Sequence, residues 1–275
     1  MTLALRPRRN HFHHRLLGRV LALAALLAAP AAARAGGVTE TIDRTLTLPR
    51  GGEVLVQNFN GHIEVAGGEG THVRLVAVKT ARAATDGRAR AYLRELQVKI
   101  EEVDGRLVIR TVTPGGDGGL MGWIAGAGVE GHVSYRLLVP RAARVTATTV
   151  NGNVEVARLH APVHAASTNG TVSVLEVGGE VDATSVNGNI RVDMRHAEPH
   201  SQMDLSTVNG SIVLYLPAEF RAFVDARTVN GSVASDLPLL VEGRRSRSRL
   251  VGSLNGGQIK LVLRTTNGSI LLRQP

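Results

Sequence analysis

Three aspartates occupy equivalent positions in a repeated part of the sequence. Asp182, Asp204 and Asp225 each lie five residues before an Asn-Gly dipeptide. If the repeats stack as adjacent strands, the three carboxylates lie about 4.8 Å apart, and their repulsion favours a bound cation or raised pKa values. Carboxylates about 5 Å apart are also the catalytic pair of retaining glycosidases. The alternative is that they are solvent-facing copies of one duplicated unit, since an acid and a base need different surroundings to separate their pKa values.

Arg244, Arg245, Arg247 and Arg249 form a second group of side chains that could do chemistry. They lie within six residues, in the longest interval between successive Asn-Gly dipeptides of the region that follows Asn151. Guanidinium groups bind phosphate and carboxylate through paired hydrogen bonds, so the segment is a candidate site for an anionic envelope polymer or lipid. Aromatic residues are absent between these arginines, which disfavours single-stranded nucleic acid. The alternative is an ordinary solvated loop.

Trp123 is the only tryptophan and lies in a Gly-rich stretch, residues 114–131. An exposed Trp in a loop is a candidate contact for a partner or a lipid, whereas the alternative places it against an edge of the fold. The sequence contains no His-Glu-x-x-His, Gly-x-Ser-x-Gly, phosphate-loop or dinucleotide-binding motif. We therefore predict no metal, cofactor or catalytic residue, and an enzyme hypothesis depends on the three aspartates alone.

The aspartates and arginines are positioned by a repeated phrase. It consists of a Ser or Thr, usually an apolar residue, Asn-Gly, a small polar residue, and Val or Ile. Its dipeptides are Asn60-Gly61, Asn151-Gly152, Asn169-Gly170, Asn187-Gly188, Asn209-Gly210, Asn230-Gly231, Asn255-Gly256 and Asn267-Gly268. From Asn151 onward the intervals are 18, 18, 22, 21, 25 and 12 residues. A period of roughly 20 residues predicts stacked coils of one β-solenoid, with the dipeptides as its structural corners.

Residues around each dipeptide alternate in a way that predicts two strands per coil. The inward positions of one copy are Val145, Ala147, Thr149, Val154 and Val156. These inward positions lie an even number of residues before the Asn and an odd number of residues after it. Inward side chains of one uninterrupted strand would recur at every second residue, so the two sets cannot share one strand. We therefore predict a bend at Asn-Gly, with hydroxyl and Asn side chains inward and hydrogen-bonded along their columns. Asn-Gly also favours a type I′ hairpin, so a meander of hairpins is the alternative fold.

Residues 1–35 have the features of a secretory signal peptide. A basic start precedes an apolar run, residues 20–29, and Ala33-Arg34-Ala35 precedes Gly36. The apolar run is too short to span a bilayer as a helix. The segment holds six of the 32 Lys and Arg and none of the 23 Asp and Glu, so 26 basic and 23 acidic residues remain. This small excess argues against nucleic-acid binding, and the absence of Cys excludes disulfides.

The segment between the leader and the repeats predicts a β region that caps the solenoid. Alternating apolar and polar residues indicate strands, and residues 86–96 indicate one short helix with Ala89, Leu93 and Leu96 on one face. Capping units deviate from the repeat they protect. We therefore divide the chain into a leader (1–35), a cap (36–142) and an Asn-Gly repeat region (143–275). An unpaired strand edge in the final coil, near Ile270–Leu272, would favour oligomerisation.

The leader, residues 54–65 and 135–140, and the Asn-Gly coils together resemble a bacterial adhesin-like β-strand-repeat family of unknown function. That family is similar to the head domains of auto-transporter adhesins. The resemblance extends over nearly all of the chain after the leader. It implies an all-β protein with a single-stranded, right-handed parallel β-helix outside the cytoplasm, and it supplies no catalytic residues.

These features predict an exported, non-catalytic β-solenoid that binds an envelope polymer or another envelope protein. No apolar segment after residue 35 is long enough to cross a membrane as a helix, and periplasm, cell surface and external medium all remain open as locations. The alternative function is that of a polysaccharide lyase or glycoside hydrolase on a β-helix, with Asp182, Asp204 and Asp225 as its active groups.

Overall fold

The structure is a computed structural model that describes residues 37–114, 128–194, 202–241, 246–257 and 259–275. Residues 1–35, Trp123, Arg244 and Arg245 lie outside the described residues, and what the sequence indicates for them stays a prediction. The described residues belong to one compact unit, Arg34–Pro275. Their strands form two sheets, and the helix among them is α2 (Asp86–Glu95).

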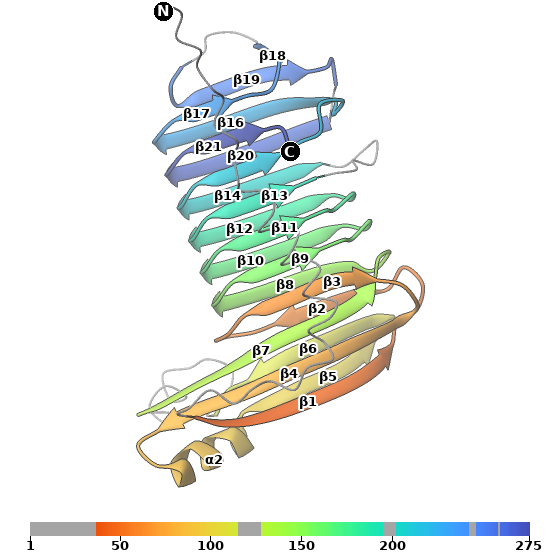
Figure 1. Cartoon of the computed structure of the whole chain (residues 1–275), viewed down its shortest axis with the longest axis vertical. Helices are drawn as coiled ribbons and strands as arrows, with labels where there is room; N and C mark the ends of the chain where they lie inside the picture. The colour runs from red at the N-terminus through yellow and green to blue at the C-terminus, as the bar shows by residue number, and fades with distance from the viewer. Residues whose placement is uncertain (1–36, 115–127, 195–201, 242–245, 258) are drawn as a thin grey trace, which may run out of the picture. The chain divides into compact units, whose positions relative to one another are not determined.

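The strands of the two sheets follow one another in the order that Figure 1 shows. Sheet A consists of β1 (Val38–Thr47), β4 (His72–Ala83), β7 (Val129–Pro140), β3 (Ile63–Gly68), β9 (Val154–Ala157), β11 (Val172–Leu175), β13 (Ile190–Asp193), β15 (Ile212–Tyr215), β21 (Ile270–Arg273) and β17 (Val233–Ser235). Sheet B consists of β18 (Leu239–Val241), β19 (Arg249–Leu254), β16 (Ala222–Asn230), β20 (Ile259–Asn267), β14 (Met203–Asn209), β12 (Val181–Asn187), β10 (Val163–Asn169), β8 (Arg144–Asn151), β2 (Glu53–Gln57), β6 (Arg106–Val112) and β5 (Gln97–Val103).

The copies of the repeated phrase from Asn151 to Asn209 form successive coils. The strand before Asn-Gly belongs to sheet B and the strand after it to sheet A, as in β8 and β9. Equivalent residues lie side by side in parallel strands, so that Asn169 is opposite both Asn151 and Asn187. Because the two strands that flank a dipeptide belong to different sheets, they do not form a hairpin. The predicted all-β, solenoid-like repeat is confirmed, and the hairpin meander is wrong.

The core lies between the inner faces of the two sheets. Val145 and Ala147 of β8 and Val154 and Val156 of β9 are at most 1% exposed. Small and β-branched side chains suit strands that are packed on one face. Each fully buried Val contributes about 1.5–3 kcal/mol through the hydrophobic effect, so the stacked columns supply most of the stabilisation of the repeat.

The region before the repeats adds long antiparallel strands and the helix α2. Thr85 caps the helix, and Ala89 and Leu93 are buried beneath it. Lys79 Nζ donates hydrogen bonds to the carbonyl oxygens of Leu93 (3.0 Å) and Leu96 (3.1 Å), which fixes the end of the helix against β4. The short helix predicted over residues 86–96 is therefore confirmed. β2 and β3 pair with β8 and β9, so both sheets continue from this region into the repeats.

The last coil of the chain does not lie at the end of the stack. β20 lies between β14 and β16, and β21 lies between β15 and β17. The long interval before Asn255 forms β18 and β19, which pair antiparallel with each other, and β19 pairs antiparallel with β16. The chain then returns to fill the space beside β14. The open edge expected at Ile270–Leu272 is therefore absent, because β21 is paired on both sides.

Candidate anion-binding face

The Asn side chains form a hydrogen-bonded ladder on the outside of the solenoid. Its members in spatial order are Asn60, Asn151, Asn169, Asn187, Asn209, Asn267 and Asn230, joined by amide hydrogen bonds of 2.7–2.9 Å. From Asn151 onward these side chains are exposed, so the prediction that they point inward is wrong. The alternation of inward and outward side chains is interrupted before the Asn. The hydroxyl residue two positions earlier is the last inward residue of its strand.

The hydroxyl residues and glycines of the corners hold neighbouring coils together. Ser167 and Ser185 are buried, and their Oγ atoms donate hydrogen bonds to the carbonyl oxygens of Gly152 (2.8 Å) and Gly170 (3.0 Å). A Cβ atom on Gly188 would lie 1.9 Å from the Gly170 oxygen. Glycine is therefore required by close approach of the coils, and the ladder dipeptides act as scaffold.

Asn255 and Gly256 are exceptions to the ladder that the sequence predicts. They lie in the turn after β19, where Asn255 Nδ2 donates hydrogen bonds to the carbonyl oxygens of Ala218 (2.8 Å) and Phe220 (2.9 Å). Asn255 has a φ of 52°, a left-handed conformation that Asn tolerates better than most residues. The dipeptide makes a turn here because the strand before it is antiparallel to β16.

The three aspartates face outward but are not one run of adjacent carboxylates. Asp182 of β12 lies beside Asp204 of β14. Val262 of the inserted strand β20 separates Asp204 from Asp225 of β16. The expected column is therefore interrupted, because the order of the coils in space differs from their order in the sequence.

Each of these aspartates has a basic partner. The pairs are Asp182 with His164 (2.9 Å), Asp204 with Arg264 (3.6 Å) and Asp225 with Arg227 (2.7 and 2.8 Å). Arg264 and Arg227 balance the charges of Asp204 and Asp225, and His164 contacts Asp182. Within the described part of the chain, no group of three or more His, Cys, Asp and Glu is placed to hold a metal.

Two of these partners belong to a row of three arginines on the outer face of sheet B. Arg227 of β16 lies opposite Arg249 of β19 and opposite Arg264 of β20, and all three are exposed. Hydrogen bonds to Asp225, together with its charge, raise the pKa of Arg227. Arg249 forms no ion pair with another described residue. We call Arg227, Arg249 and Arg264 the arginine row; the exposed Arg247 lies in the turn that leads to it.

Only Arg249 of this row belongs to the arginine group predicted from the sequence. Arg227 and Arg264 come from separate coils, which hides their proximity in a linear reading. Both lie three residues before an Asn-Gly dipeptide. Aligning the outward positions of the coils, as well as the inward ones, would have revealed that these two residues share a column.

The coils, their corners and the preceding strands together match one known domain family. Residues 43–273 match the model of the Toastrack DUF4097 family. The chain belongs to this family. No curated protein matches the sequence of this Toastrack chain.

Three solved structures are similar to this Toastrack chain at low sequence identity. A proposed cell adhesion protein from Clostridium sporogenes is 12% identical, with a TM-score of 0.45 over 86% of this chain and 100% of its own. A proposed adhesin from Bacteroides fragilis is 8% identical, with a TM-score of 0.40 over 86% and 97%. A proposed lipid-binding protein from Parabacteroides distasonis is 9% identical, with a TM-score of 0.25 over 87% and 97%. Among the described residues of the Toastrack chain, no helix has the length and apolarity needed to cross a membrane.

Proposed function

We propose that this chain is an exported, non-catalytic β-solenoid that binds an anionic polymer of the cell envelope through the arginine row. The supporting observation is the alignment of Arg227, Arg249 and Arg264 on three neighbouring strands. Like charges directly opposite one another in a sheet are destabilising. The repulsion within a row of arginines is compensated when a polyanion supplies several negative groups along the same line.

The charges around the row leave a positive excess for such a ligand. Asp225 and Asp204 each pair with one arginine, whereas Arg249 has no acidic partner among the described residues. The exposed Lys260 adds a further positive charge on β20, four residues before Arg264. The Arg264–Asp204 pair is exposed on both sides and 3.6 Å long. Such a pair contributes little to stability, so Asp204 can yield Arg264 to a phosphate or carboxylate at small cost.

The enzyme alternative has weaker support. Each aspartate already contacts a basic side chain on the outer face of sheet B. A groove formed by β2, β6 and β5 lies toward the other end of this sheet, away from all three aspartates. We expect neither the wild-type chain nor an Asp204→Asn variant to release reducing sugars from a panel of envelope polysaccharides. Release by the wild type that Asp204→Asn abolishes would establish the enzyme instead.

Location and winding are part of the same proposal. Residues 1–35 would be removed as a signal peptide, which places the row outside the cytoplasm where envelope polymers occur. Residues 36–142 would act as the cap of a single-stranded coil formed by residues 143–275. Parallel strands joined by a crossover are right-handed in nearly all proteins, and we expect the same of this coil.

Binding to immobilised polyphosphate tests the role of the row. We expect the wild-type chain to bind with an affinity that falls as salt rises, and a triple Arg227→Gln, Arg249→Gln, Arg264→Gln variant to bind at least tenfold more weakly. The matched control replaces three exposed arginines elsewhere by Gln, namely Arg44, Arg90 and Arg144, and should retain binding. Equal affinity of the two triple variants would overturn the assignment.

A further inference from the structure

A groove of about 470 Å³ lies on the outer side of sheet B, at the opposite end from the arginine row. It is formed by β2, β6 and β5 and by the loop that follows β2. Its size falls in the range of small-molecule sites in proteins. The side chains of the groove differ between its two ends, and that difference indicates a ligand class.

One end of the groove is polar and carries a single excess positive charge. Gln57, Arg110 and Lys99 lie opposite one another on β2, β6 and β5. Arg110 pairs with Glu101 at 2.9 Å, and its Nε has no hydrogen-bond partner among the described residues. Lys99 has no ion pair with any described residue. This end therefore suits a ligand group with one negative charge, such as a carboxylate.

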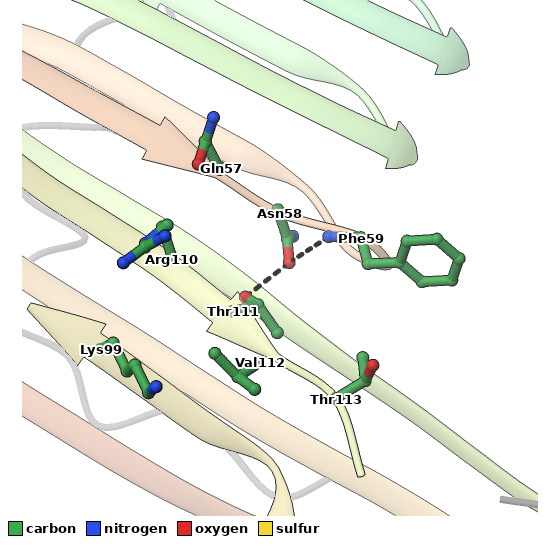
Figure 2. Close-up of a pocket in the computed structure, with 8 residues that line it drawn as sticks. All are labelled: Gln57, Asn58, Phe59, Lys99, Arg110, Thr111, Val112 and Thr113. Carbon is green, nitrogen blue, oxygen red and sulfur yellow. Dashed lines mark hydrogen bonds between the residues drawn. The ribbon is translucent and has the colours of Figure 1, made fainter. Parts of the chain in front are cut away.

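The other end of the groove presents an aromatic ring. Phe59 is 41% exposed. In Figure 2 Phe59 lies at the far end of the groove from Lys99 and Arg110, with Thr111 and Val112 between them, and its ring points away from the two basic side chains. An exposed ring beside polar groups suits a ligand that has both an apolar face and hydrogen-bonding groups.

A saturated hydrogen-bond network around Asn58 holds the backbone at Phe59 in place. Asn58 is 8% exposed. Its Oδ1 accepts from Phe59 N (3.0 Å) and from Thr111 Oγ1 (2.8 Å), and its Nδ2 donates to the carbonyl oxygens of Gly61 (3.1 Å) and Val133 (2.8 Å). All four hydrogen-bonding positions of the amide are therefore occupied. The loop is preorganised, so binding there costs little conformational entropy.

We infer that this groove binds an acidic sugar residue, a uronate unit of a polysaccharide. The carboxylate of one sugar unit binds Lys99 and Arg110 and its hydroxyl groups bond to Gln57, whereas the C–H face of a neighbouring unit packs on Phe59 at the other end of the groove. A free fatty acid would match the charge but would leave the polar wall unpaired. The groove and the arginine row are far apart in the strand order of sheet B, so either assignment can fail without the other.

Calorimetric titration with trimers of galacturonate, glucuronate and mannuronate tests this site. We expect saturable one-to-one binding of at least one trimer, and at least tenfold weaker binding of the corresponding neutral trimer. Lys99→Gln and Phe59→Ala should each weaken uronate binding at least fivefold, whereas the conservative Phe59→Tyr should retain it. Arg106→Gln, on β6 but outside the groove lining, and Arg264→Gln, in the arginine row, are controls that should bind normally.

The outcomes separate the two sites. Binding of none of the three uronates by the wild-type chain overturns the groove assignment and leaves the polyphosphate result untouched. Uronate binding that Arg264→Gln removes and Lys99→Gln does not would assign the sugar to the arginine row instead. Equal binding of neutral and acidic trimers would also reject the role given to Lys99 and Arg110.

Discussion

At the scale of single residues, the corners of the solenoid depend on buried hydroxyl groups. A polar side chain in a core is tolerated when its hydrogen bonds are satisfied. Ser185 meets this condition, since it is 5% exposed and donates to the Gly170 carbonyl oxygen at 3.0 Å. The hydroxyl therefore fills the last inward position of the strand and also joins two coils, which an apolar side chain of similar size cannot do.

Replacing one such hydroxyl should lower stability measurably. We expect Ser185→Ala to reduce the free energy of unfolding by about 1 kcal/mol, the usual net value of a buried hydrogen bond. Thr184→Ala removes a hydroxyl from the neighbouring outward position and should change it by less than about 0.5 kcal/mol. Urea unfolding followed by circular dichroism measures both. Equal midpoints for Ser185→Ala and the wild type would show that the hydrogen bond contributes nothing.

Tyr135 makes stability depend on pH in the alkaline range. Burial raises its pKa to about 12, from about 10 in the unfolded chain. The unfolded state therefore loses this proton first, and the contribution of the neutral phenol is lost as pH rises through 10 toward 12. Tyr135→Phe loses the hydrogen bond with Thr111 (2.6 Å) and should be less stable than the wild type at pH 8 by about 1 kcal/mol.

That difference should shrink with rising pH. Because the variant has no phenol to ionise, the gap should narrow by about 1.4 kcal/mol between pH 8 and pH 11, since pH 11 is one unit above the pKa of the unfolded phenol and still below that of Tyr135 in the folded chain. Urea midpoints at both pH values give the comparison. A gap that stays constant would mean that Tyr135 does not remain neutral in the folded chain.

At the scale of the coil, glycine sets how closely neighbouring corners approach. Gly188 has no room for a side chain, because a Cβ atom there would lie 1.9 Å from the Gly170 oxygen and 2.5 Å from its carbonyl carbon. Both of these atoms belong to the backbone, so relief would require the two coils to separate. Separation would in turn lengthen the hydrogen bonds of the Asn ladder on either side.

Gly188→Ala should therefore be among the most damaging single substitutions. We expect it to lower the free energy of unfolding by about 3 kcal/mol or more, at the upper end for overpacking. Gly87→Ala is the matched control, because Gly87 lies in α2, where an added Cβ atom would point into open space with no neighbouring element within 4 Å. Alanine favours helix, so that variant should be as stable as the wild type or more stable by up to about 1 kcal/mol. Similar midpoints for the two variants would contradict the close-approach explanation.

The coil is also the scale at which the sequence was most informative. Burial of Val145, Ala147 and Val154 follows from local alternation, and the helix follows from the spacing of Ala89 and Leu93. Each of these features is set by neighbours within a few residues. The outward direction of the Asn side chains was missed, because alternation shows that the phase changes near the dipeptide but leaves the residue of the change undetermined.

At the scale of the whole molecule, the order of the coils could not be predicted from the period. A repeat of similar intervals predicts sequential stacking, yet β20 and β21 occupy an interior position. The interior position of β20 depends on pairing between strands that are far apart in the sequence. Asp204 of β14 and Asp225 of β16 both lie opposite Val262 of β20, so the two strands pair with β20 in the same register. For the same reason the arginine row, which β20 completes, was invisible to a linear reading of the chain.

This insertion makes the final coil a link between two parts of each sheet. β16 is paired with β19 and β20, and β17 with β21, so the last strands before residue 255 join the other coils through β20 and β21. In stacked-repeat proteins each repeat is stabilised by its contacts with its nearest neighbours. Removing residues 255–275 should therefore leave β8 to β15 folded and release β16 to β19. Hydrogen exchange should show rapid exchange over residues 222–241 and retained protection over residues 145–192.

Adding a peptide of residues 255–275 to the truncated chain should restore protection of β16, because the vacated position has a partner strand on each side. A peptide with the same composition in scrambled order is the control. The competing outcome is that β16 moves one position and pairs directly with β14, since both strands hold the same register to β20. That pairing would set Asp225 beside Asp204, and opposed like charges are destabilising. Protection of β16 in the truncated chain without peptide would mean that apolar contacts outweigh this repulsion and that the final coil is dispensable as a link.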